Sequence, residues 1–170
     1  MDGVIRIYRE VLNELIKHCN IDREVECGGY LYGNYKKGKD SHAITINAIY
    51  SEEIFGTENK FNFPLSYEFR AKEYGKQIGR ELIGCYHSHG NYPAIFSHQD
   101  RILETHYMNN NTALIYSPIE DKLIGDIITT EGIVYSSRII IIDSQNLDKL
   151  YNPKLQSTSC KVMSLKKLRK

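Results

Sequence analysis

The chain has 170 residues, 41% of them hydrophobic, which is enough for one domain with its own core. Its 22 basic and 21 acidic residues leave a net charge of +1, so no strong field favours nucleic acid or an acidic membrane as a partner. We recognise no signal peptide and no apolar run near the roughly 20 residues that span a bilayer. The four cysteines form no Cys-x-x-Cys pair. We therefore expect a cytoplasmic protein with free thiols and no membrane partner.

The first quarter of the chain predicts a strand, a helix and two further strands. Residues 4–7 alternate enough for a short strand. Apolar residues then recur at i, i+3, i+4 and i+7, which predicts an amphipathic helix over residues 9–19. Residues 28–33 and 42–50 have the composition of strands, and the basic, glycine-containing segment 36–39 is typical of a turn between them.

The middle of the chain predicts a loop, two helices and one buried strand. Residues 51–63 show no clear period and indicate a surface loop. A second helix is expected over residues 65–79, and the apolar run 82–86 predicts a buried strand. A third helix is expected to begin near Ser97, whose hydroxyl can cap it, and to stop at the Asn109–Asn111 run.

The last part of the chain predicts three more strands and then a basic tail. Residues 112–117, 122–129 and 133–143 have strand patterns, so the expected fold class is α+β with a mixed sheet. From residue 144 onward the periodicity fades, and residues 154–170 carry six basic residues and no acidic one. We predict one domain over residues 1–143 and an extension with a basic tail over 144–170.

The segment most informative about function is His87-Ser88-His89, followed by Ser97 and Asp100. Residues two apart on a strand point the same way, so both imidazoles are expected on one face. If the intervening loop folds the next helix back over the strand end, Asp100 supplies a third ligand. Two nitrogens, one carboxylate and an open fourth position for water are typical of a catalytic zinc site.

Such a site also requires a general base and a donor for the developing oxyanion. The candidate base is Glu26, at the entry to a glycine-rich predicted strand. Glu24, two residues earlier, would lie on the same face and remains an alternative. The Ser97 hydroxyl is the candidate oxyanion donor.

The residues Glu26 in ECGGYLYG and the pattern H-S-H-x₇-S-x-x-D resemble the signature of the JAMM (JAB1/MPN+) zinc metalloproteases, in their compact prokaryotic form. The resemblance extends over roughly residues 4–143. It implies an MPN/JAB-like, cytidine-deaminase-like fold, in which a curved mixed β-sheet is wrapped by about three helices. It also implies one Zn²⁺ per chain on His87, His89 and Asp100, with Glu26 as acid/base and Ser97 at the oxyanion.

The resemblance further implies a peptidase or isopeptidase that acts at the C-terminus of a ubiquitin-like protein, in deconjugation or precursor processing, with an activating partner chain as one option. The alternatives are a protease that trims the tail of a sulfur-carrier protein and a non-catalytic scaffold stiffened by metal. We expect the 51–63 loop, with Phe55, Phe61 and Phe63, to contact the substrate tail.

One position departs from the family pattern. Gly90 follows the second histidine, where family members usually carry proline, and glycine is expected to loosen the loop entry. Cys27 and Cys85 flank ligand-bearing positions. We expect them to pack as small apolar side chains rather than to ligate this metal.

Overall fold

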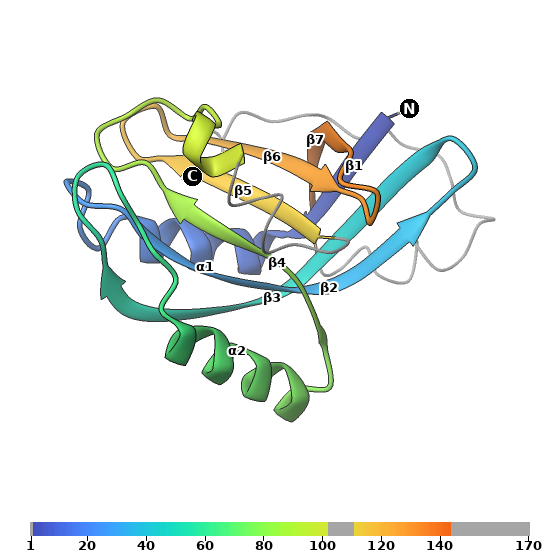
Figure 1. The fold of residues 1–170 in the computed structure, drawn as a ribbon, viewed down its shortest axis with the longest axis horizontal. Coiled ribbons are helices and arrows are strands. Elements are labelled where there is room, and N and C mark those ends of the chain that lie inside the picture. The colour runs from blue at the N-terminus through green and yellow to red at the C-terminus, as the bar shows by residue number, and fades with distance from the viewer. Residues whose placement is uncertain (1, 102–110, 144–170) are drawn as a thin grey trace.

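The computed structural model describes residues 2–101 and 111–143 (Figure 1). Two helices and seven strands are bounded within these residues, in the chain order β1 (Asp2–Tyr8), α1 (Arg9–Cys19), β2 (Cys27–Lys37), β3 (Ser41–Phe55), α2 (Leu65–Gln77), β4 (Glu81–Ser88), β5 (Asn111–Ser117), β6 (Lys122–Ile128) and β7 (Val134–Ile142). The predicted mixture of helices and strands is confirmed. The predicted tail lies outside the described residues.

The seven strands close into a barrel in the order β1-β3-β2-β4-β5-β6-β7, with β7 returning to β1. Three strand pairs are parallel, namely β1–β3, β1–β7 and β4–β5, and the other pairs are antiparallel. The sheet is therefore mixed, as expected, but it is closed rather than simply curved. The closure depends on β1, which pairs with β3 on one side and β7 on the other.

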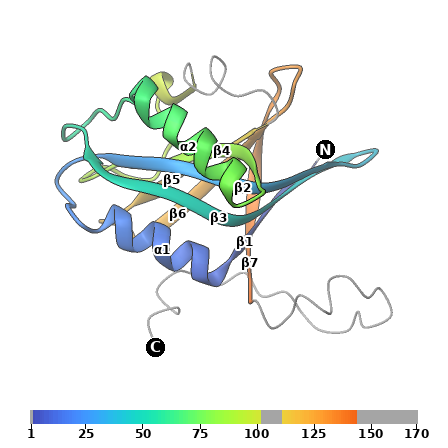
Figure 2. The same cartoon turned by 90° about the horizontal axis from the view of Figure 1, so that it is seen from below.

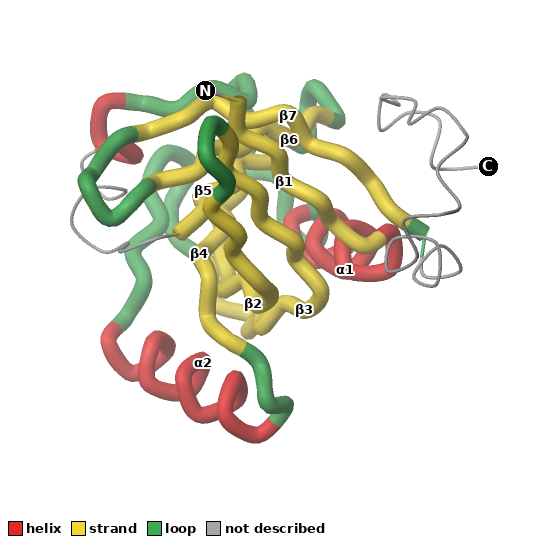
Figure 3. Tube along the Cα trace, turned by 90° about the vertical axis from the view of Figure 1, so that its right-hand side faces the viewer, coloured by secondary structure: helices red, strands yellow, loops and turns green. Residues whose placement is uncertain are grey.

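The two helices cover opposite faces of the β2–β3 layer, as the view from below and the tube drawing show (Figures 2 and 3). The apolar stripe of α1, including Leu12 and Leu15, packs against barrel residues such as Ile5 and Ile46 in the main core. On the other face, Tyr67 and Ala71 of α2 pack with other side chains in a second, aromatic cluster. Burial of both faces explains why β2 begins with seven consecutive buried residues instead of alternating.

The prediction of a surface loop over residues 51–63 is wrong in part. β3 continues to Phe55, paired with β2 as far as Cys27. The β2–β3 pair contains two register irregularities, which disturb the alternation from which strands are predicted. Phe61, in the remaining loop, is buried in the aromatic cluster.

The third predicted helix begins immediately after Ser97, at residue 98. Its predicted stop, at Asn109 and Asn110, lies outside the described residues. Neither α1 nor α2 is long and apolar enough to cross a membrane.

Candidate metal centre

Three side chains with metal-binding donor atoms meet at the C-terminal end of β4. His87 lies on the strand, His89 follows it, and Asp100 lies in the first turn of the third helix. The two carboxylate oxygens face different rings: Oδ1 is 3.1 Å from His87 Nε2, and Oδ2 is 3.4 Å from His89 Nε2. One donor atom from each residue lies within 4.8 Å of the others. The structure thus brings together the three predicted ligands.

Hydrogen bonds to the barrel fix both histidines. His87 is paired in register with Gly28 across the β2–β4 ladder. Beyond the strand end, the His89 backbone N–H donates to the Tyr116 carbonyl of β5 at 3.0 Å. His89 Nδ1 lies 2.9 Å from the Pro93 carbonyl, and because a carbonyl only accepts, Nδ1 carries the hydrogen. Nε2 is therefore the nitrogen available to a metal ion, in the arrangement typical of metal-ligating histidines.

Asp100 and Ser97 form a reciprocal cap at the start of the third helix. The Asp100 N–H donates to Ser97 Oγ at 3.1 Å, and the Ser97 N–H donates to Asp100 Oδ2 at 2.7 Å. This pattern is a capping box. It satisfies two backbone donors at the helix start and orients the Asp100 carboxylate toward the histidines. The Ser97 hydroxyl accepts one of these bonds, so its own hydrogen is left to donate.

Burial and hydrogen bonding act in opposite directions on Asp100. Burial of the carboxyl group disfavours its ionised form, but His87 and His89, whose rings can donate to the carboxylate through Nε2 when they are protonated, outweigh this effect. The pKa of Asp100 is therefore held well below its usual range. On His89, burial lowers the pKa, but the Asp100 carboxylate and the Pro93 carbonyl raise it above its ordinary value. The group is a preformed anion beside two imidazoles.

Gly90 begins the loop between His89 and Ser97 in a left-handed conformation, and hydrogen bonds connect that loop to the barrel. Gly90 has a φ of +50°, in the left-handed region, which proline cannot adopt because its ring fixes φ near −65°. Hydrogen bonds then hold the loop: the Ser117 hydroxyl donates to the Tyr92 carbonyl, and the Ala94 N–H donates to the Glu120 carboxylate. Glycine here permits an entry into the loop that proline cannot adopt.

The two candidate bases are placed differently. Glu26 is 7% exposed, and burial raises its pKa above the ordinary value, although His87 and His89 lower it. The backbone N–H of Phe61 hydrogen-bonds the Glu26 carboxylate. Glu24 is exposed and does not line the cleft described below. Of the two, only Glu26 is buried and lies beside the histidines, where a carboxyl group can exchange a proton with a reacting group.

A cleft of about 250 Å³ connects these groups. Its walls combine the metal-binding group and Glu26 with polar and aromatic residues, namely Asn59, Lys60, Phe61, Phe63, His87, His89, Tyr92, Pro93, Ile95, Ser97, Gln99 and Asp100. All five predicted site residues line it. Of the three aromatic residues expected to contact substrate, Phe61 and Phe63 line the cleft, and the Phe55 side chain lies outside what the structure describes.

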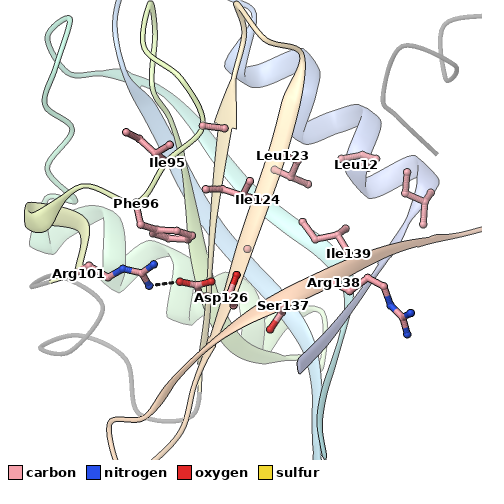
Figure 4. A pocket seen from close by; sticks show the side chains of 14 residues that line it. Leu12, Ile95, Phe96, Arg101, Leu123, Ile124, Asp126, Ser137, Arg138 and Ile139 are labelled. Carbon is pink, nitrogen blue, oxygen red and sulfur yellow. Dashed lines mark hydrogen bonds and ion pairs between the residues drawn. The ribbon is translucent and has the colours of Figure 1, made fainter. Parts of the chain in front are cut away.

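A larger cavity, of about 520 Å³, is lined by Phe96, by Arg101 and by residues of β6 and β7 (Figure 4). In it, the Arg101 guanidinium pairs with the buried carboxylate of Asp126 on β6 and stacks over Phe96, 4.4 Å from the ring centre. The residue after the third ligand is thus attached to the barrel wall. Sequence reasoning missed this pair and the Pro93 carbonyl. The position of Arg101 next to Asp100 in the sequence could have suggested a role for Arg101. Nothing in the sequence near Arg101 indicates that its partner is Asp126.

The donor set suits a divalent metal ion. Two imidazole nitrogens and one carboxylate, partly buried with exposed fractions of 13%, 8% and 12%, are ligands that zinc and several other first-row metals accept. The hydrogen bond from His89 to Pro93 supplies the outer support that such sites use.

Comparison with known proteins gives a similar fold and a family. The solution structure of protein DSY2949 from Desulfitobacterium hafniense is similar to this chain, with a TM-score of 0.66 and 22% sequence identity over 82% of this chain and 94% of that one. At this identity the likeness concerns the fold alone. A search of curated proteins found no match. The family model of prokaryotic homologues of the JAB domain matches residues 9–132, and the chain therefore belongs to that family.

Proposed function

We propose that this protein has an MPN-type fold and is a zinc-dependent peptidase or isopeptidase that cleaves at the C-terminus of a ubiquitin-like protein in the cytoplasm. The observation that carries the proposal is the position of Glu26: a buried carboxyl group with a raised pKa lines the same cleft as His87, His89 and Asp100. A purely structural metal site has no need of an acid/base group beside it.

Each side chain of the site has a separate role in the proposed hydrolysis. His87, His89 and Asp100 would hold the zinc ion, which when bound acts as a Lewis acid and makes a nucleophile available from water near neutral pH. Glu26 accepts the proton of the attacking water and delivers it to the leaving amine. The Ser97 hydroxyl donates to the oxygen that becomes negative in the transition state.

The shape of the cleft favours a flexible tail over a folded surface. Its volume is about 250 Å³, which admits a few extended residues. Phe63 and Tyr92 supply apolar walls, and Asn59, Lys60 and Gln99 supply polar groups for peptide amides. The C-terminal tail of a ubiquitin-like protein has this form. Deconjugation and precursor processing, including that of a sulfur carrier, require the same chemistry on different leaving groups.

The test is to measure zinc content and turnover together on the purified chain. Ubiquitin-like fusions and lysine conjugates serve as substrates, with and without a chelator. We expect about one zinc at this centre and chelator-sensitive cleavage. Glu26→Gln should lower turnover about 10²- to 10⁴-fold while zinc is retained, because only proton transfer is removed. Glu24→Gln is the matched control and should cleave normally.

Cleavage that survives Glu26→Gln would refute the assigned role of this residue. Zinc bound without cleavage of any substrate, alone or with cell extract added as a source of an activating chain, would favour the scaffold alternative. Activity that appears only with extract would identify a partner requirement.

A further inference from the structure

A second group of metal-binding side chains lies in the core, outside the cleft. His18 and Cys19 form the end of α1, and Cys27 begins β2. Their exposed fractions are 5%, 0% and 0%. One donor atom from each lies within 4.8 Å of the others, and Cys27 Sγ is 3.8 Å from His18 Nδ1. Two ligands of one tetrahedral zinc ion, sulfur at about 2.3 Å and nitrogen at about 2.0–2.1 Å, lie at a similar separation from each other.

The orientation of the His18 ring directs a lone pair into this group. His18 Nε2 lies 2.9 Å from the Glu52 carbonyl, so Nε2 carries the hydrogen and donates it. Nδ1 is then the unprotonated nitrogen, and it faces Cys27 Sγ and the Tyr86 hydroxyl, the latter at 2.9 Å. A histidine that donates one ring N–H to a backbone carbonyl and offers the other nitrogen is the usual form of a metal ligand.

Further polar contacts surround the Cys27 sulfur. The Ser88 hydroxyl donates to Cys27 Sγ at 3.5 Å, and the Cys27 N–H donates to the same Ser88 oxygen at 3.0 Å. An apolar packing role does not require a hydroxyl donor directed at sulfur. The expectation that Cys27 serves only as a small apolar side chain is therefore incomplete.

We propose that His18, Cys19 and Cys27 supply three ligands of a second metal site, a buried site for Zn²⁺. Two sulfurs and one imidazole nitrogen are a softer donor set than that of the cleft and suit zinc and other thiophilic ions. Binding replaces the thiol protons, which leave to solvent. The site joins the end of α1 to the start of β2, and Cys27 directly follows Glu26. The ion thereby supports the strand entry that positions Glu26.

The absorption spectrum of bound Co²⁺ distinguishes the two sites. Sulfur ligands give Co²⁺ an intense charge-transfer band, and nitrogen and oxygen ligands do not. We would express the chain in cobalt-supplemented medium, so that the buried site can fill as the protein folds. The background carries Cys85→Ser and Cys160→Ser, which leaves Cys19 and Cys27 as the only thiols. His87→Ala with His89→Ala removes the cleft site in the same background.

We expect the His87→Ala/His89→Ala protein to retain about one cobalt per chain with the sulfur charge-transfer band, and Cys27→Ala to lose the band. The intact background protein should show the band and about twice the cobalt. The cobalt measurement does not depend on turnover, so it tests the second site even if the protein is not a protease. If Cys27→Ala fails to fold, the presence or absence of the band in the intact background protein still decides the proposal. Cobalt bound without the band, or a mass two hydrogens lighter from a Cys19–Cys27 disulfide, would overturn the proposal.

Discussion

The Arg101 guanidinium forms an ion pair with the Asp126 carboxylate and thereby attaches the helical turn that carries Asp100 to β6. Asp126 is 1% exposed, whereas the Arg101 side chain is 42% exposed. Burial raises the pKa of Asp126 above its ordinary value, and the guanidinium partly offsets this effect. The pair should therefore both stabilise the folded barrel and hold the metal ligand Asp100 in position.

Arg101→Ala should lower both stability and zinc affinity. A buried carboxylate left without its partner typically costs about 3–5 kcal/mol, and the exposure of Arg101 reduces our expectation to about 2 kcal/mol at pH 7. Loss of the outer support should weaken zinc binding about tenfold. Urea denaturation and competition with a chromophoric chelator measure the two effects. Zinc affinity equal to that of the unaltered chain would show that the pair does not position Asp100.

The stability loss in Arg101→Ala should depend on pH in a defined direction. The pKa of Asp126 is raised in the folded state, so the favourable contribution of its neutral form is complete below the unfolded pKa of about 3.9 and is lost as pH rises through the folded pKa. Without the guanidinium the folded pKa rises further. The stability difference between Arg101→Ala and the unaltered chain should therefore grow from pH 4 to pH 7. Asp126→Asn combined with Arg101→Ala should remove this growth.

Gly90→Pro should disrupt the metal centre, although the resemblance seen in the sequence implies proline at this position. The φ of +50° is closed to proline, so the loop would have to rebuild its entry next to His89. We expect zinc affinity to fall and the melting temperature to decrease. Gly90→Asn is the matched control, because asparagine tolerates the left-handed region and should cost less than about 1–2 kcal/mol. A proline variant with unchanged zinc affinity would contradict the observed loop conformation.

Ser97→Ala should separate the capping role of the hydroxyl from its proposed catalytic one. Loss of the helix cap costs about 1 kcal/mol of stability. Loss of an oxyanion donor costs about 3–4 kcal/mol of transition-state stabilisation, which is about 10²- to 10³-fold in kcat. Thermal denaturation and steady-state kinetics measure the two separately. A decrease in kcat of less than tenfold would leave Ser97 as a capping residue only.

Phe63→Ala tests the aromatic wall of the cleft. Phe63 is half-buried, whereas Phe61 is 6% exposed and packs against Phe63 with ring centres 4.8 Å apart. Phe61→Ala would therefore damage the core as well as the wall. We expect Phe63→Ala to raise KM for a ubiquitin-like fusion with little change in kcat, because the wall binds substrate and transition state equally. Unchanged kinetics would remove Phe63 from the substrate contact.

The local sequence pattern was sufficient to predict α1, α2 and the strand before the metal ligands. The apolar stripe of α1 is regular and is buried as a unit, so its predicted bounds, residues 9–19, match the structure. The run before His87 is apolar because both faces of β4 are covered: Ile83 and Tyr86 lie in the main core, and Leu82 and Cys85 pack against the aromatic cluster. By contrast, the end of β3 and the closure between β1 and β7 depend on pairing between distant segments, which no local period records.

The metal ligands could be predicted because their spacing in the sequence is diagnostic. The contacts that orient them could not be predicted, because they depend on the folded path of a loop. His87, His89 and Asp100 meet as their spacing predicts. The Pro93 carbonyl that orients His89, and the Glu120 carboxylate that holds Ala94, act through loop geometry that exists only after folding. The roles of Glu26 and Ser97 in turnover stay predictions.

The place of β4 within the closed barrel has a consequence for how the metal centre responds to metal loss. A strand hydrogen-bonded on both sides belongs to the part of a domain that opens only with global unfolding. The amides of Cys85 and His87 should accordingly exchange with deuterium among the slowest in the molecule, with or without metal. Asp100 lies outside the sheet and is held instead by its helix cap and by the Arg101–Asp126 ion pair beside it. Any change in the centre when metal is removed should therefore fall on Asp100 and its helical turn, while His87 stays in place with its strand.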